Sequence, residues 1–439
     1  MGLTSLLKNK TVKNAGWIIG GKIAYMAMSF IVGLLTARYL GPSSYGLISY
    51  ATAYVTFFHA FCTLGITNIL VKKFVDSPDE EGVTIGTTLV LRGISSLLSI
   101  GVIVGIVAIV DKGENLTVLV ALLCSLGVMF QIFDTINYWF QRRLKSKYSS
   151  LASLVGYFVV SAYRVLLLIL NASVEFFALA TAVDYLVIAV FLIIAYKKNQ
   201  GPKFSFSIKK AKELLRESSS FILTGMMGAI YAVTDKFMLK QMIGETVVGY
   251  YAVAVALSTI WCFVLSAVID SVVPSIMEAH NKEEELFEKR CVQLYAIVFY
   301  LSLFVSLMFT IFSDLAIKIL YGKAYLPSSN ILKVVTWYTA FSYLGVARNS
   351  WMVCKNVQKY SIIIYVTAAL ANIVGNYFLI PVLGAVGAGL ASLITQILTI
   401  LIAFFIKPLR RNFVLMCKAV ILKGVFEKKN QTINTQGEN

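Results

Sequence analysis

The sequence predicts an all-α polytopic membrane protein with twelve transmembrane helices, arranged as two six-helix bundles that form a parallel repeat. Three observations predict this fold: twelve apolar stretches of roughly twenty residues, cations concentrated in alternate connections, and helix-end motifs that recur in the second half. Of the 439 residues, 58% are hydrophobic and only 14% are charged. A soluble domain carries about a quarter charged residues, so the body of this protein lies in a bilayer.

Each apolar stretch is long enough to cross the hydrocarbon core as a helix, because about 20 residues span ~30 Å. The first stretch follows a basic N-terminal segment and has no small-residue cleavage site, so we expect a transmembrane helix rather than a removed signal peptide. The twelve predicted helices are 15–37, 45–70, 84–109, 115–140, 149–170, 174–196, 217–241, 246–274, 291–313, 331–353, 360–380 and 385–406.

The distribution of cations predicts the orientation of these helices. Of the 39 lysines and arginines, 28 fall in the N-terminal segment, the even-numbered connections and the C-terminal tail, and six fall in the odd-numbered connections. Cationic connections stay on the cytoplasmic side, so both termini are expected there. The net charge of +17 then meets anionic membrane lipids, and nucleic acid is not an expected partner.

The connections also predict four segments. The longest predicted cytoplasmic connection separates two sets of six helices, and the region after the last helix alternates cations with apolar residues, which is typical of a basic interfacial helix. The segments are an N-terminal bundle (1–196), a basic cytoplasmic linker (197–216), a C-terminal bundle (217–406) and a basic amphipathic cytoplasmic tail (407–439), whose helix is expected over 410–430.

Two motifs recur at equivalent places in the halves. Gly41 and Gly46 follow the first predicted helix, and Gly244 and Gly249 follow the seventh. Gly244 lies 203 residues after Gly41, and Gly249 lies 203 residues after Gly46. Lys-Tyr-Ser begins both at position 147 and at position 359, after the fourth and tenth helices. Because each half has an even number of helices, both enter the membrane in the same direction. Rocking of one half against the other around a central cavity is the expected motion.

Cations within predicted helices are candidates for holding an anionic cargo. A charge in the membrane marks a pathway by default, and the donors of arginine suit phosphate oxygens. The candidates are Arg92, Arg164, Lys22 and Arg348, and Lys236 is a further intramembrane cation. Two alternatives remain open: Arg164 forms an ion pair with Asp184, and Lys22 and Arg348 extend to the cytoplasmic interface.

Three other ionisable residues are candidates for ion coupling or gating. Asp235 and Asp184 are buried carboxylates that suit a proton or sodium site, and Asp235 also suits gating by exchange of salt bridges. His59 suits a proton relay, the alternative being a hydrogen-bonded packing residue.

The sequence does not predict an enzyme. It contains no P-loop, no H-E-x-x-H, no G-x-S-x-G, no paired acidic metal motif and only two histidines. The six cysteines form no C-x-x-C pair, so neither a zinc site nor a disulfide framework is indicated. No cofactor is expected beyond a proton or sodium gradient.

Three segments resemble a known family. The segment Thr36–Gly46 is similar to the "ARYLGPxxYG" signature of polysaccharide and O-antigen flippases, which belong to the multidrug/oligosaccharidyl-lipid/polysaccharide exporter superfamily. Asp235–Leu239, followed by Gly244 and Val248–Tyr251, resembles the "D-x-x-M-L…G…VGxY" pattern of the same family. Tyr321–Tyr325 resembles its "fGxxY".

The resemblance implies a MATE-like, V-shaped fold in the inner membrane of a prokaryote. It also implies flipping of a polyprenyl-diphosphate-linked oligosaccharide, such as an O-antigen or exopolysaccharide repeat unit, from the inner to the outer leaflet. We expect a monomer whose partners are this substrate, anionic lipids and glycan-assembly proteins. The main alternative is a MATE-type multidrug antiporter coupled to protons or sodium; a membrane glycosyltransferase or polymerase and a non-transporting scaffold are the others.

Overall fold

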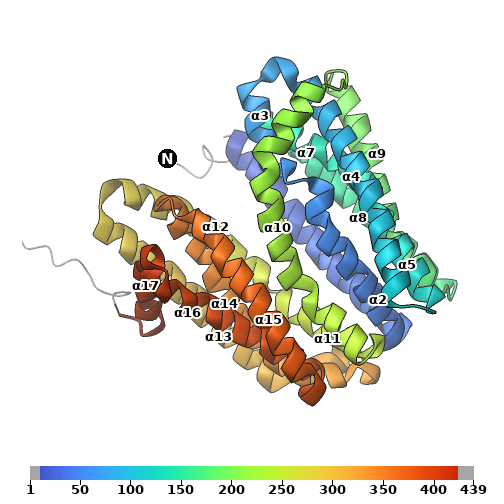
Figure 1. The fold of residues 1–439 in the computed structure, drawn as a ribbon, viewed down its shortest axis with the longest axis vertical. Helices are drawn as coiled ribbons and strands as arrows, with labels where there is room; N and C mark the ends of the chain where they lie inside the picture. The colour runs from blue at the N-terminus through green and yellow to red at the C-terminus, as the bar shows by residue number, and fades with distance from the viewer. Residues whose placement is uncertain (1–9, 424–439) are drawn as a thin grey trace, which may run out of the picture.

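The computed structural model describes residues 10–423, with side chains from Met26 onward except that of Thr224. Every regular element within these residues is an α-helix or a 3-10 helix. The helices form two bundles that converge where α2 and α11 meet and diverge toward α3 and α17, so the molecule is V-shaped (Figure 1). The predicted fold class, an all-helical membrane protein, is confirmed.

The first bundle contains the elements that precede the linker. They are α2 (Lys10–Thr63), η1 (Ile66–Asn68), α3 (Leu70–Asp76), η2 (Pro78–Glu80), α4 (Glu81–Val110), α5 (Asn115–Ser125), α6 (Gly127–Gln131), η3 (Ile132–Asp134), α7 (Thr135–Arg142), α8 (Lys147–Ile169) and α9 (Val174–Lys198).

The second bundle contains the remaining elements. They are α10 (Ile208–Met242), α11 (Glu245–Thr259), α12 (Cys262–Lys282), α13 (Glu284–Leu320), η4 (Lys323–Tyr325), α14 (Pro327–Cys354), η5 (Gln358–Tyr360), α15 (Ser361–Leu383), α16 (Ala385–Phe405), η6 (Lys407–Leu409) and α17 (Arg410–Val420).

All twelve predicted helices fall on these elements, and the first two lie within α2 as two helices on either side of a kink with non-helical backbone. They form the two limbs of α2, which bends at Gly41, where φ is 70°. Glycine tolerates this backbone, so the helix changes direction without a loop. Within the described residues, nine helices are long and apolar enough to cross a membrane, and α2 and α14 are not among them. The count of twelve therefore stays a prediction.

The tail forms a shorter helix than predicted. α17 ends at Val420, and residues 424–439 lie outside the described part of the chain. Leu415, Met416 and Ala419 are buried against the second bundle. The apolar face of α17 is therefore covered by protein, which explains why this short basic segment is helical.

Residues 199–207, which connect α9 to α10 within the predicted linker, and the first half of α10 pack on the first bundle. The Ser205 amide donates to the Gly82 carbonyl at 3.2 Å, and Lys210 pairs with Glu80 of η2. A Cβ on Gly86 would lie 2.3 Å from the Ser205 carbonyl oxygen, so only glycine permits this approach. The second half of α10 packs on α15. α10 consequently spans from one bundle to the other, as its central course in Figure 1 illustrates.

The repeated glycines meet at the convergence of the bundles. A Cβ on Gly46 of α2 would lie 1.9 Å from the Glu245 carbonyl oxygen, and a Cβ on Gly249 of α11 would lie 2.0 Å from that of Pro42. Equivalent residues of the two halves therefore make reciprocal contacts, as expected at the axis of a parallel repeat. We call the end of the molecule where the bundles converge the latch end. The opposite end, where α3, the linker and α17 lie, is called the basic end.

Candidate functional site

A cavity of about 490 Å³ lies between the two bundles. Side chains of α2, α8 and α9 line it from the first bundle, and side chains of α10 and α11 line it from the second. Its wall combines hydroxyls with aromatic rings, and the residues that carry them are Ser29, Ser49, Thr52, Thr181, Thr259, Phe30, Tyr45, Phe177 and Tyr321.

Among the side chains that the structure describes, two cations face this cavity, one from each bundle. Arg164 is on α8, Lys236 is on α10, and both side chains are half-buried. Across residues 26–423, neither group forms a hydrogen bond or an ion pair; the carboxylates of Asp184 and Asp235 act on them only at longer range. The ion pair between Arg164 and Asp184 considered as an alternative is thus not formed. Unpaired cationic donors in a membrane cavity suit an anionic group.

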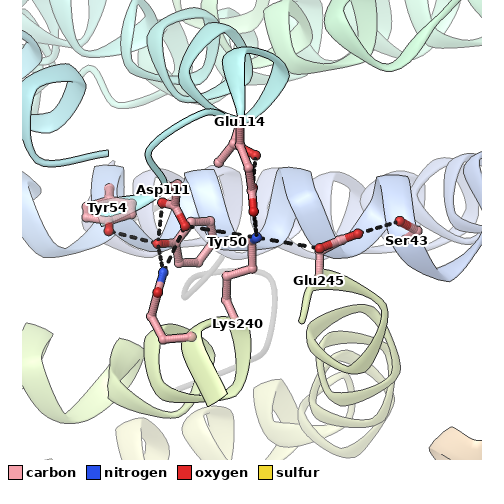
Figure 2. Close-up of polar contacts among 9 residues, drawn as sticks. Ser43, Tyr50, Tyr54, Asp111, Glu114, Lys240 and Glu245 are labelled. Carbon is pink, nitrogen blue, oxygen red and sulfur yellow. Dashed lines mark hydrogen bonds and ion pairs between the residues drawn. The ribbon is translucent and has the colours of Figure 1, made fainter. Parts of the chain in front are cut away.

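An ion-pair cluster closes the latch end and joins the bundles (Figure 2). Lys240, near the end of α10, donates to both carboxylate oxygens of Glu114 at 2.8 and 2.9 Å. The same ammonium lies 3.5 Å from Glu245 and 3.9 Å from Asp111. Only 7% of Lys240 is exposed, so its charge depends on these three carboxylates. We call Lys240, Glu114, Glu245 and Asp111 the latch.

Neutral groups support the latch on both sides. The Tyr50 hydroxyl of α2 donates to Asp111 at 2.8 Å, and the Gln241 amide of α10 donates to Asp111 at 2.8 Å and to Tyr50 at 3.0 Å. Ser43 of α2 donates to Glu245 at 3.2 Å (Figure 2). Hydrogen bonds from Lys240, and from the Thr117 hydroxyl of α5, hold the pKa of Glu114 below its ordinary value.

The three family-like segments meet at the same end. Arg38 donates to the carbonyl of Ile319, and the Tyr325 hydroxyl donates to the carbonyl of Ala37 at 2.8 Å. The Tyr325 ring also lies edge-on to Tyr45 and to Tyr250, with centroids 6.5 and 6.3 Å away. These residues therefore hold the two bundles together.

Asp235 lies inside the second bundle, bound by four neutral donors. The Tyr251 hydroxyl donates to it, Asn376 and Asn372 donate at 2.7 and 3.1 Å, and Ser392 donates at 2.8 Å. These donors from α11, α15 and α16 compensate the carboxylate, of which only 7% is exposed. Within the described residues no ion pair reaches Asp235 at short range, so its role in coupling or gating stays a prediction.

Arg92 supports an irregular helix instead of lining the interbundle cavity. Its guanidinium donates to the carbonyls of Gln131 and Ile132 at 3.0 and 3.3 Å and to the Thr135 hydroxyl at 3.1 Å. These acceptors lie where the helix tightens from α6 into η3, and Asp134 adds a nearby negative charge. Arg92 is therefore not among the residues that line the interbundle cavity, and its contact with substrate stays a prediction.

The other predicted residues are dispersed. His59 of α2 shares a 2.9 Å hydrogen bond with Gln131, outside the interbundle cavity, and one buried oxygen of Asp184 has no hydrogen-bond partner among the described residues. Arg348 lines a different cavity within the second bundle. The Lys22 side chain lies outside the described residues. The roles assigned to these residues stay predictions.

The sequence-based selection of site residues omitted two lysines of α10. Lys236 is an intramembrane cation in the sequence but is not one of the predicted site residues, and Lys240 is one of the six cations of the odd-numbered connections. A signal for both existed, since lysines four residues apart lie on one face of a helix. That face points toward the first bundle, which the sequence alone does not show.

Comparisons with known proteins agree with this geometry. A family model described as polysaccharide biosynthesis protein matches residues 35–330. An inward-facing multidrug resistance MATE family transporter of the MOP superfamily superposes with a TM-score of 0.70 at 16% identity, covering 91% of this chain and 99% of its own. The lipid II flippase MurJ in an inward closed conformation gives 0.71 at 16% identity, with 92% and 91% covered.

A third similar structure is a MOP superfamily transporter from Pyrococcus furiosus, described by a binding pocket of reverse polarity that suggests a different function. Its TM-score is 0.57 at 14% identity, with 94% of this chain and 98% of that chain covered. At these identities the structures show a shared fold. A search of curated proteins gave no significant match.

Proposed function

Because this chain belongs to the polysaccharide biosynthesis protein family, we propose that it is an alternating-access flippase for a polyprenyl-diphosphate-linked oligosaccharide. The proposed direction is from the inner to the outer leaflet of a prokaryotic cytoplasmic membrane. The observation that carries the proposal is that Arg164 and Lys236 face one cavity from opposite bundles. Neither cation has a hydrogen-bond or ion-pair partner among the described residues.

A lipid-linked diphosphate matches this cavity in charge and in shape. Arginine can bind phosphate oxygens through two donors, and lysine supplies a compact positive charge, so the two cations would hold the headgroup between the bundles. The hydroxyls and aromatic rings of the wall suit a polar glycan. The polyprenyl chain stays in the bilayer, where it needs no polar partner.

The closed latch supports alternating access. In this conformation one end of the interbundle interface is held by ion pairs, and the bundles diverge toward the basic end (Figures 1 and 2). With the basic end at the cytoplasm, as the distribution of cations predicts, the substrate enters from the inner leaflet. Rocking of the bundles then opens the latch end and releases the substrate outward.

Ion coupling is assigned to Asp235. Its network joins α10, the helix that spans both bundles, to α11, α15 and α16, so a proton or sodium ion bound there can change how α10 packs. Asp184 and His59 of the first bundle are secondary candidates for this role.

The experiment uses purified protein in proteoliposomes that contain undecaprenyl diphosphate linked to a fluorescent N-acetylglucosamine. A membrane-impermeant quencher then reports the fraction of probe that has reached the other leaflet. Arg164→Gln and Lys236→Gln should each slow flipping at least tenfold, whereas Lys282→Gln, an exposed lysine paired with Glu278, should not.

Wild-type flipping rates in the double variant Arg164→Gln/Lys236→Gln would refute the assignment of these cations. The multidrug antiporter alternative predicts a different result, namely ethidium efflux that depends on an ion gradient and no movement of the lipid probe. Two unpaired cations in the cavity argue against an organic cation as cargo.

A further inference from the structure

A second cavity of about 220 Å³ lies wholly within the second bundle, among α10, α14, α15 and α16. No residue of the first bundle lines it, so it is separate from the interbundle cavity. Its wall carries the Arg348 guanidinium together with hydroxyl and amide groups, which are contributed by Ser342, Asn349, Ser361, Tyr231, Tyr365, Gln396 and Thr399.

The charge of Arg348 is not compensated within the described residues. Its Nη1 donates to the Thr399 carbonyl at 2.8 Å, and its fully buried Nε has no hydrogen-bond partner. Only 6% of the residue is exposed, and its electrostatic neighbours are the phenols of Tyr295 and Tyr365 rather than a carboxylate. A buried cation without a counter-charge is strongly unfavourable.

Arg92 provides the contrast. Arg92 is also buried, and its Nε likewise has no hydrogen-bond partner among the described residues, but its two Nη atoms donate to three acceptors and Asp134 lies nearby. Arg92 lines neither the interbundle cavity nor the Arg348 cavity. Arg348 therefore differs from Arg92 in having both an uncompensated charge and space beside it.

We propose that the Arg348 cavity is a binding site for a small inorganic anion such as chloride or phosphate. A guanidinium with hydroxyl and amide donors supplies hydrogen bonds of the polarity that an anion requires. The volume is large enough for a hydrated ion, since one water occupies about 30 Å³ in the liquid. Ser361 begins α15 directly after η5, so the cavity reaches the basic end of the bundle, where an aqueous ion can enter.

The site adjoins the Asp235 network. Tyr231 and Asp235 lie one helical turn apart on α10, and their partners Gln396 and Ser392 lie one turn apart on α16. An anion beside Arg348 would therefore strengthen binding of a cation at Asp235, and the coupling is reciprocal. The anion site itself does not rest on the proposed flippase activity.

Thermal unfolding of the purified full-length protein in detergent tests the proposal. Sodium chloride and sodium phosphate are each compared with sodium gluconate at equal ionic strength. We expect the unfolding temperature of the wild type to rise by about 1–3 °C, saturably, in chloride or phosphate. The salt that acts at the lower concentration identifies the preferred anion. No difference from gluconate in either salt would overturn the proposal.

Substitutions locate the site. Arg348→Gln should abolish the rise, and Arg410→Gln, which removes an exposed arginine at the same end, should retain it. Loss of the rise in Arg164→Gln with retention in Arg348→Gln would place the anion in the interbundle cavity and overturn the proposal. If Arg348→Gln does not fold, Arg348→Lys keeps the charge but changes the donors. About tenfold weaker half-saturation in that variant supports the site, and unchanged half-saturation overturns it.

Discussion

Removal of the Lys240 ammonium should open the latch end. An exposed ion pair contributes about 0.2–1 kcal/mol, whereas breaking a buried pair costs about 3–5 kcal/mol. The latch lies between these limits, because Lys240 is 7% exposed while the side chains of Glu114 and Glu245 are 48% and 39% exposed. We therefore expect Lys240→Met to destabilise the closed conformation by about 2 kcal/mol, which shifts the ratio of closed to open molecules about thirtyfold.

The assay is a distance measurement between spin labels on the two bundles. Cysteines are introduced at Lys112, between α4 and α5, and at Lys323 of η4, in a background without the six native cysteines. Both positions are exposed at the latch end, so labels do not disturb the core. Double electron–electron resonance in nanodiscs should show one short distance in the parent and a second, longer distance in Lys240→Met.

The matched control is Lys333→Met. Lys333 pairs with Asp314 at 3.0 Å, but both residues lie in the second bundle and are partly exposed, so the distance distribution should stay that of the parent. An unchanged distribution in Lys240→Met would show that the glycine crossing and the Tyr325 contacts close this end without the latch. The reasoning about the ammonium would then be wrong.

Three further predictions concern the latch, the crossing and the buried arginines. Hydrogen bonds in the closed conformation lower the pKa of Glu114, so its stabilisation of that conformation is complete above its ordinary pKa of 4.5 and is lost as the pH falls through the lowered pKa. The same spin-label pair should therefore show opening only below about pH 4.5. Opening at pH 6 would contradict this. Gly249→Ala places a Cβ 2.0 Å from a backbone oxygen of α2 and should destabilise the closed protein by about 1–3 kcal/mol, measured as a lower unfolding temperature. Arg92→Met removes the donor to three acceptors and should destabilise the fold by about 2 kcal/mol, measured as a lower unfolding temperature. Arg164→Met should leave the unfolding temperature unchanged or raised. An equal fall in unfolding temperature in both variants would refute the distinction between the two arginines.

The helices and the repeat could be read from the sequence because they depend on local energetics. An apolar run must be helical in a bilayer to satisfy its own backbone, whatever its neighbours are. Gly41 and Gly244 could be paired by position because each stands where the chain turns with a positive φ, of 70° and 135°.

The assignment of charges to sites depends on how helices rotate and cross. Arg92, Arg164 and Arg348 look alike in the sequence, since each is an arginine within an apolar run. In the fold, Arg92 binds the carbonyls of a helix break, Arg164 faces the space between the bundles, and Arg348 lies in a cavity of the second bundle. No local pattern distinguishes these three environments.

The membrane class, the helical segments and the family-like motifs of this protein are therefore encoded in short stretches of chain, because burying an apolar backbone in lipid allows few alternatives. The latch is different in kind. Asp111 and Lys240 are 129 positions apart in the sequence and come together only when α10 crosses to the first bundle. An ion pair between residues so far apart in the sequence forms only when whole helices pack together, and no short segment of the chain specifies that packing.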